Sequence, residues 1–238
     1  FQIFCDFSGY SDIAVGTARC MGYELMNNFD RPYMSGGISE FWRRWHISLS
    51  SWFRDYLYFP LGGSKGGTWK RVRNTFIIFL VSGFWHGANW TFIIWGLLNA
   101  LYIMPSILFK TNRNNLDTVA QGKYLPSVRE FFSMAVTFAL TVLAWIFFRA
   151  ESVGEAINYI SGIFSPSLFD FPEIHPVPIL VIIILFMIIE WIGREQQYAI
   201  AKIPTLLNKP IRWGFYLLIV EAIFLYAGKQ QQFIYFEF

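Results

Sequence analysis

Histidine is the side chain best suited to proton transfer near neutral pH, and this sequence has three. His86 stands in the uncharged segment Val81 to Trp90, which reads VSGFWHGANW. An imidazole held out of water stays neutral and can take a proton from a hydroxyl, as general base catalysis requires. Asn89 would share its face in a continuing helix and is then placed to orient the ring. The alternative is a structural histidine bonded to the backbone at a helix break.

The other two histidines lie in different settings. His46 belongs to a segment rich in aromatic and basic residues, whereas His175 stands in an acidic loop and is assigned no role. Because the three histidines are far apart and the only cysteines are Cys5 and Cys20, we expect no metal site. The two cysteines are expected to be small buried residues.

The segment Ile38 to Tyr56 predicts an amphipathic helix that carries His46. Its apolar residues recur at helical spacing, while charged residues including Arg43, Arg44 and Asp55 fall on the opposite side. A helix with a Trp-rich apolar face and a cationic face lies in the membrane interface. On a continuous helix His46 would face the protein or the acyl chains. The apolar positions are Ile38, Phe41, Trp42, Trp45, Leu49, Trp52, Phe53 and Tyr56.

Long apolar runs predict membrane-spanning helices around this segment. Thr75 to Phe109 contains no charged residue but exceeds the roughly 20 residues that one span needs. Small and polar residues interrupt its middle, so we expect two helices that meet at a break around His86. Phe1 to Met21 is a weaker candidate, because Asp6 and Asp12 interrupt it. The further expected spans are Phe131 to Phe148, Val177 to Gly193 and Ile211 to Gly228.

The charges of the loops predict an orientation. Gly62 to Arg73, Lys110 to Arg129 and Arg194 to Arg212 each carry four basic residues, whereas Glu151 to Pro178 carries four acidic residues and no lysine or arginine. Cytoplasmic loops are enriched in lysine and arginine. The first three loops are therefore expected on the cytoplasmic side and the fourth outside.

Composition favours the same class of protein. Of the 238 residues, 55% are hydrophobic, 20% aromatic and only 15% charged, whereas a soluble domain carries about a quarter charged residues. A disordered chain would be poorer in aromatic residues and richer in charge. The net charge of +3 is spread over loops, unlike the clustered basic face of a nucleic-acid-binding protein. We expect an all-α polytopic membrane protein that contacts lipids and binds no nucleic acid.

Several motifs carry a resemblance to a known family. The segments FWRRWHISLS at 41–50, FRDYLYFPLGG at 53–63 and FWHGANW at 84–90 resemble the membrane-bound O-acyltransferase family, and within it the alginate O-acetyltransferase branch of bacteria. The segments CDFSGYSD at 5–12, WIFFRA at 145–150 and FIYFEF at 233–238 are similar to it as well. Because the family's proteins are longer, residues 1–238 are expected to form one membrane domain whose N-terminal half is missing.

The resemblance implies a fold, a reaction and a site. It implies broken or re-entrant helices and an interfacial helix around a central tunnel, in a multi-pass protein of the bacterial inner membrane. It also implies acyl transfer from acetyl-CoA or another thioester as donor substrate, with no bound cofactor. His86 matches the family's active-site histidine and His46 its second polar position, for which structural support of the tunnel wall is the alternative. The supporting residues are Asn89, Trp85, Arg43, Arg44 and Asp55.

A reaction can be sketched from these residues as a hypothesis. The thioester approaches from the cytoplasm past the basic loop and the Arg43 and Arg44 side chains, which attract an anion. His86 activates an oxygen nucleophile, and His46 positions the thioester or stabilises the developing oxyanion. Tyr235 in the aromatic tail is a candidate acyl relay to an extracytoplasmic partner. The alternative for Tyr235 is an aromatic anchor at the membrane interface.

Three functions stay open from the sequence. The first is O-acetylation of an extracytoplasmic polysaccharide such as alginate or another envelope polymer, with an SGNH-like acetyltransferase as partner. The second is D-alanyl transfer to teichoic acid by a related protein of the family. The third is a transporter or flippase, which would explain a buried His86 and Glu221 but not the Trp-Arg-His helix.

Overall fold

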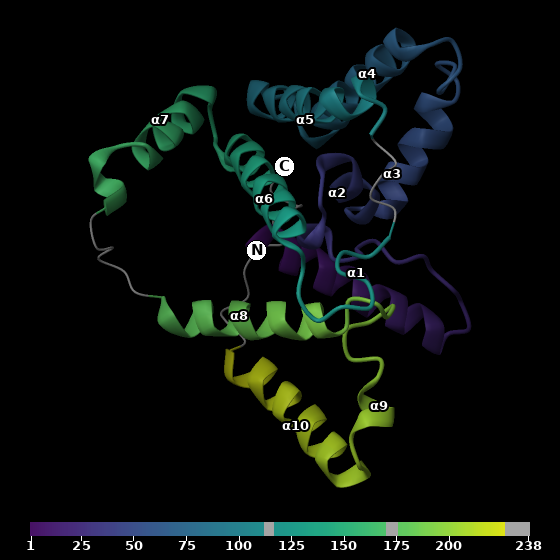
Figure 1. The fold of residues 1–238 in the computed structure, drawn as a ribbon, viewed down its shortest axis with the longest axis vertical. Coiled ribbons are helices and arrows are strands. Elements are labelled where there is room, and N and C mark those ends of the chain that lie inside the picture. Colours follow the sequence, from purple (N-terminus) through teal and green to yellow (C-terminus); the bar gives the residue numbers. More distant parts are fainter. Residues whose placement is uncertain (112–116, 170–175, 227–238) are drawn as a thin grey trace. The chain divides into compact units, whose positions relative to one another are not determined.

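Every regular element of residues 1–111, 117–169 and 176–226, the parts that the computed structural model describes, is a helix (Figure 1). The expected all-α class is confirmed. The α-helices are α1 Gln2–Cys20, α2 Ile38–Arg44, α3 Ile47–Phe53, α4 Thr68–His86, α5 Trp90–Leu108, α6 Val128–Arg149, α7 Val153–Ile163, α8 Val177–Ile192, α9 Ile203–Leu206 and α10 Lys209–Tyr226. The shorter helical turns are η1 Pro32–Met34, η2 Arg54–Tyr58 and η3 Pro166–Phe169.

The chain divides into two compact units. Unit 1 consists of Phe1–Phe7 and Pro176–Phe238, and unit 2 consists of Ser8–His175. Unit 2 contains α2 to α7 and therefore both His46 and His86. That residues 1–238 act as one membrane domain stays a prediction.

Within the described parts of the chain, two helices are long and apolar enough to cross a membrane. They are α5 and α6, with 19 and 22 residues, whereas the very apolar α8 has 16. These three helices occupy predicted spans. The other predicted spans are helical as well: α1 and α4 occupy two of them, and α10 occupies the described part of the last one.

Helices α4 and α5 form a closely packed hairpin. A methyl group on Gly83 of α4 would collide with the backbone carbonyl of Phe92, and one on Gly96 of α5 would collide with that of Phe79. Small residues at such positions let two helix backbones approach closely. Gly83 therefore makes room for the neighbouring helix.

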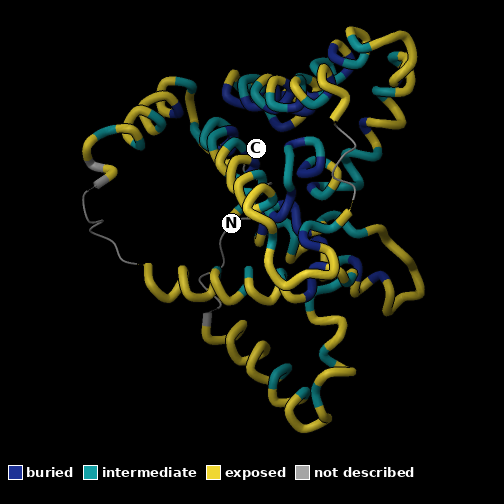
Figure 2. The backbone as a smooth tube through the Cα atoms, viewed as in Figure 1, coloured by how far each residue is buried: buried dark blue, intermediate teal, exposed yellow. Residues whose placement is uncertain are grey.

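The core of unit 2 lies where α2, α4 and α5 meet. Figure 2 shows buried positions along α2 and α5. Trp42 of α2 packs edge-on against Phe79 of α4, with ring centroids 5.3 Å apart. The loop before α6 ends in a capping box, in which Ser127 and Glu130 bond to each other's backbone amides. The buried cluster between these helices is Ile38, Val72, Phe79, Ala100, Ile103 and Ile107.

The helices of unit 1 expose much of their apolar surface. No residue of α8 is buried, and its isoleucine and leucine side chains are largely exposed (Figure 2). Apart from Glu190 near its end, α8 is apolar on every side, which is the surface of a lipid-facing helix. Cys5 and Cys20, expected to be buried, are both exposed, because each lies on a side of α1 that no other described residue covers.

Candidate active site

His86 is the last residue of α4, at a break between two apolar helices. Gly87 follows with φ +155° and ψ 158°, and Asn89 begins α5 as its N-terminal cap. The ring of Phe92 fills the space where a Gly87 side chain would stand. The predicted break around His86 is therefore confirmed, and the imidazole projects from a fixed helix end.

Aromatic rings surround His86, whose exposed fraction is 9%. Its ring centroid lies 4.8 Å from that of Phe148 on α6 and 5.3 Å from that of Trp95 on α5, both edge-to-face. The rings of Trp85 and Phe92 lie 4.9 and 6.1 Å away. Trp85, a predicted supporting residue, is itself 56% exposed. Such a setting excludes water and favours the neutral imidazole.

Asn89 does not orient His86, which corrects the expectation from the sequence. Its side-chain carbonyl accepts from the Thr91 amide at 3.1 Å, and its NH₂ group donates to the Glu151 carbonyl at 3.0 Å. Because the helix ends at His86, the three-residue spacing no longer puts the two side chains on one face. Asn89 instead caps α5 and ties the break to the loop after α6.

His46 interrupts the predicted amphipathic helix, which is a second correction. The segment 38–56 is not one helix: α2 ends at Arg44, His46 has φ 44° and ψ 58°, and α3 begins at Ile47. A non-glycine residue in this left-handed region is uncommon and found often at functional positions. Each of these two helices has seven residues, which is too short to span a membrane. Burial of the imidazole lowers the pKa of His46 to about 4.

The structure brings His46 and His86 together, although 40 residues separate them in the chain. The two imidazoles are near enough to interact electrostatically. A row of aromatic rings runs from the neighbour of His46 to His86: Trp45 lies 5.1 Å from Trp145, and Trp145 lies 5.1 Å from Phe148, which packs edge-on against His86. The site therefore combines residues of α2, α4, α5 and α6.

The indole N–H of Trp145 is buried without a hydrogen-bond partner in the described chain. Trp145 is 8% exposed and lies 5.9 Å from Trp95, ring to ring. An orphaned buried donor is rare in a folded protein. Here it lies beside Trp95 and Phe148, two of the rings that surround His86.

Only part of the apolar face of the segment 38–56 is exposed at the protein surface. Phe41 and Trp45 are 1% and 2% exposed and pack inside unit 2, and the Trp42 indole donates to the Asn99 side chain at 3.2 Å. Trp52 on α3 is 53% exposed. The interfacial position predicted for the whole segment is therefore wrong for α2, whose aromatic face covers protein.

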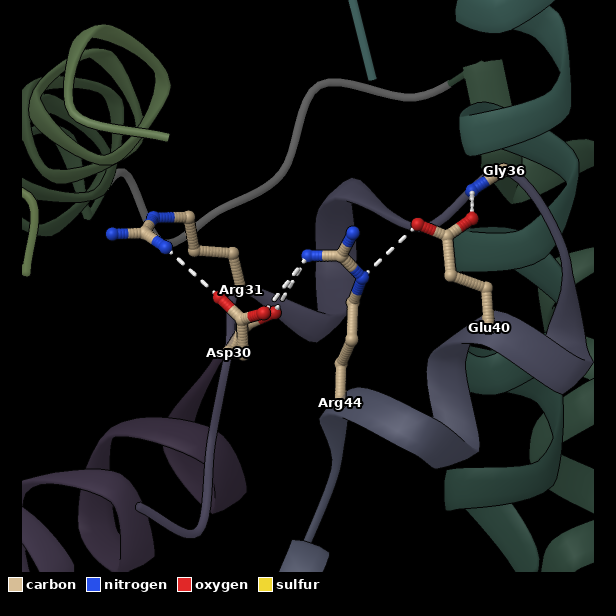
Figure 3. A network of polar contacts seen from close by, with 5 residues as sticks. All are labelled: Asp30, Arg31, Gly36, Glu40 and Arg44. Carbon is tan, nitrogen blue, oxygen red and sulfur yellow. Dashed lines mark hydrogen bonds and ion pairs between the residues drawn. The ribbon is translucent and has the colours of Figure 1, made fainter. Parts of the chain in front are cut away.

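The predicted basic and acidic supporting residues have different settings. Arg44 is held in an ion-pair network, in which it contacts Glu40 at 3.0 Å and Asp30 at 3.2 Å (Figure 3). Asp30 also contacts Arg31 at 2.9 Å, and the Gly36 amide donates to Glu40 at 2.8 Å. Burial raises the pKa of Glu40, which Arg44 opposes. Arg44 thus fastens the loop before α2 to that helix.

Asp55 and Arg43 lie on surfaces. Asp55 pairs with the adjacent Arg54 at 2.8 Å, and hydrogen bonding from that arginine lowers the pKa of Asp55. Arg43 lines a cavity of about 690 Å³ together with Arg129, Tyr102, Ser106 and Thr111. This cavity lies at the end of α5 opposite to the His86 break.

Some residues of the site carried no signal in the sequence. Asn28 and Ser48 bond to each other beside His46, and Phe148 of α6 packs against His86, with Trp145 against Phe148. The motif WIFFRA contains the last two but does not say what they touch. Tyr235 and His175 lie outside the described residues. Within the described chain, no three metal-ligating side chains gather.

Comparisons with known proteins agree with the resemblance in the motifs. The sequence model of the membrane-bound O-acyltransferase family matches residues 1–148. The chain is 37% identical to a probable alginate O-acetylase of Pseudomonas aeruginosa, over 83% of this chain and 37% of that protein. It is 40% identical to a peptidoglycan O-acetyltransferase of Helicobacter pylori, over 68% and 29%. It is 34% identical to a teichoic acid D-alanyltransferase of Bacillus subtilis, over 63% and 38%. The chain spans less than half the length of these relatives.

Proposed function

Since the chain belongs to the membrane-bound O-acyltransferase family, we propose that it carries the catalytic histidines of an O-acetyltransferase. The acetyl group comes from a cytoplasmic thioester such as acetyl-CoA and reaches an extracytoplasmic polysaccharide. The protein acts as a multi-pass protein of the bacterial inner membrane. The enzyme class follows from the family and from relatives that are O-acetyltransferases.

One observation supports the proposal most directly: His86, enclosed by aromatic rings, lies near enough to His46 to interact with it electrostatically, although the two are far apart in sequence. In the proposed reaction His86 takes the proton of the attacking oxygen nucleophile as general base, the C–S bond of the thioester breaks, and the protonated imidazole returns that proton to the leaving thiolate. His46 is the second polar group of the site. It either positions the thioester or stabilises the negative charge that develops on the thioester oxygen. The other sequence-predicted residues, Trp85, Arg43 and Asp55, lie outside this enclosed core.

The charges at the two ends of the α4–α5 hairpin support the direction of transfer. The basic loop at 62–73 leads into α4, whose 19 residues give a length of about 28 Å. His86 ends this helix, and Asn89 ties the break to Glu151 in the acidic loop. Basic loops favour the cytoplasmic side. His86 would then lie near the outer surface, where the acceptor is.

The cavity at the opposite end is the place that we assign to the charged arm of the donor. Arg43 and Arg129 line it, and an anion such as the phosphates of acetyl-CoA would be attracted there. Three carboxylates also line it: Glu40 is engaged with Arg44 and Gly36 and Glu130 with Ser127, and Asp117 is the third. The polysaccharide and an SGNH-like acetyltransferase partner belong to the outer side of the proposal.

The Trp145 indole N–H is the donor that we assign to the thioester carbonyl oxygen as negative charge develops on it. Replacing Trp145 with phenylalanine keeps a ring but removes this N–H. We expect kcat to fall about 10- to 100-fold with little change in KM. The matched control is Trp52→Phe on the exposed part of α3, which should leave kcat unchanged. A Trp145→Phe enzyme with wild-type kcat would refute the assignment.

The relative that transfers D-alanine supports a second candidate. D-alanyl transfer to teichoic acid would use the same histidines but a carrier-protein thioester in place of acetyl-CoA. The cavity lined by Arg43 and Arg129 suits either anionic donor. The transporter alternative has no support from these relatives, all of which are named for group transfer.

The donor separates these candidates. Membrane vesicles that carry the protein are supplied with radiolabelled acetyl-CoA or with a D-alanyl carrier protein, and label in polymeric product is measured. We expect label from acetyl-CoA alone. Label from D-alanine alone would establish the second candidate, and no label from either donor would contradict both.

A further inference from the structure

A chain of polar side chains runs from α1 to His46. The Asn28 NH₂ group donates to Ser11 at 3.3 Å, and the Ser48 hydroxyl donates to the Asn28 carbonyl oxygen at 2.6 Å. The same hydroxyl oxygen lies 3.4 Å from Nδ1 of His46. Ser11 is buried, so this chain is anchored inside unit 2.

The orientation of the Asn28 amide follows from its partners. The backbone amide of Ser48 donates to Oδ1 of Asn28 at 3.2 Å, and an N–H group can only meet an acceptor there. Oδ1 therefore faces Ser48 and Nδ2 faces Ser11. With the amide placed in this way, the short contact between Ser48 Oγ and Asn28 Oδ1 needs a proton, which only the hydroxyl can supply.

The proton of Ser48 then decides the tautomer of His46. A serine hydroxyl has one proton, and this one is donated to Asn28. Towards His46 the hydroxyl oxygen can only accept, so Nδ1 is the protonated nitrogen. A neutral imidazole with a proton on Nδ1 has its lone pair on Nε2. Burial lowers the pKa of His46 to about 4, so the neutral ring prevails at pH 7.

Backbone hydrogen bonds join the loop at residues 28–30 to the chain on both sides of His46. The Ile47 amide donates to the Asn28 carbonyl at 2.9 Å, and the Asp30 amide donates to the Arg44 carbonyl at 3.0 Å. The pairing fixes the left-handed turn at His46, which an isolated chain would disfavour. The ion pairs of Figure 3 anchor this loop further to α2.

We propose that Asn28 and Ser48 are positioning residues that hold His46 with its proton on Nδ1, so that Nε2 serves the acyl transfer as a hydrogen-bond acceptor. This inference rests on the proposed function of His46. It decides between the two roles left open there, because a neutral Nε2 without a proton cannot donate to an oxyanion. His46 thus acts as an acceptor towards a protonated group of the substrate or nucleophile.

Ser48→Ala tests the proposal while the backbone bond from Ser48 to Asn28 is kept. Without the hydroxyl both tautomers are open to His46, and we expect kcat for acetyl transfer to fall about tenfold with KM unchanged. Ser48→Thr retains a hydroxyl and should restore most of the rate. Ser51→Ala, one turn along α3, is the matched control and should behave as wild type.

The pH profile separates positioning from a general loss of structure. Asn28→Asp keeps the acceptor of Ser48 but adds a negative charge near His46. This charge favours the imidazolium and should move the acid limb of kcat up by about one pH unit. Across the site His86 is the titratable group that interacts electrostatically with His46, while the nearby Asp30 and Arg44 pair with each other at 3.2 Å. A purely structural role would lower the rate with the acid limb unmoved.

His46→Ala distinguishes failure of this inference from failure of the proposed function. If His46→Ala is inactive while Ser48→Ala and Asn28→Asp keep the wild-type rate and pH profile, the positioning role is overturned and the catalytic role stands. If His46→Ala is fully active, both are overturned. Thermal unfolding of each purified variant confirms that the comparison is made between folded proteins.

Discussion

Replacement of His86 by alanine is expected to reduce acyl transfer about a thousandfold or more. The general base alone contributes roughly 10²- to 10⁴-fold to a rate. The imidazole is enclosed by Trp95 and Phe148 and shielded from water, so no solvent molecule takes its place easily. The measurement is incorporation of labelled acetate into envelope polysaccharide by cells that carry only the variant.

The control for this experiment is the amount of protein in the membrane. Alanine is a good helix former at the end of α4, so variant and wild type are expected to reach equal levels. His175→Ala is the matched histidine variant, because the sequence assigns this residue no role, and it should acetylate normally. Full acetylation by His86→Ala would disprove the assignment of the active site.

Gly83→Ala is expected to disrupt the α4–α5 hairpin that holds His86. The added methyl group would collide with the Phe92 carbonyl, and a backbone atom cannot move aside as a flexible side chain can. We expect a loss of about 3 kcal/mol or more in the free energy of unfolding, and a matching loss of activity. Denaturant or thermal unfolding of the purified protein in detergent measures it.

Gly162 of α7 provides the opposite case. Nothing lies within 4 Å of a methyl group built there, so Gly162→Ala should be neutral or stabilising by up to about 1 kcal/mol. A Gly83→Ala protein as stable as Gly162→Ala would show that the two helices do not pack as closely as described.

The helices and the break at His86 could be predicted because they depend on local sequence. A run of apolar residues interrupted by Gly83, Gly87 and Asn89 predicts two helices and a turn, and α4 and α5 have this form. The histidine at the turn was identified for the same reason. The apolar helices α6 and α8 were likewise expected from uninterrupted runs.

The break at His46 could not be predicted, because its cause lies elsewhere in the chain. The period of the apolar residues continues from Ile38 to Tyr56, and nothing within this segment demands a left-handed residue. The pairing of Asn28 with Ile47 and of Asp30 with Arg44 imposes the turn. Such pairing depends on residues that lie 14 to 20 positions away.

What packs against the aromatic face of α2 could not be predicted from the sequence either. Periodicity shows that one face of α2 is apolar but not whether lipid or protein covers it. The burial of Phe41 and Trp45 comes from packing within unit 2, with Trp45 against Trp145 of α6, a hundred residues later. For the same reason the partners of Asn89 were missed, since Glu151 lies 62 positions away.

The central claim is that His46 and His86 form one catalytic site, and a double-mutant cycle tests it most directly. Transfer of acetyl from labelled acetyl-CoA is measured with purified wild type, His46→Ala, His86→Ala and the double variant in lipid nanodiscs. Groups that act as one unit show strongly non-additive losses. We predict that the double variant is no slower than the slower single variant. Losses that multiply in the double variant, or a single variant with the wild-type rate, would contradict the account.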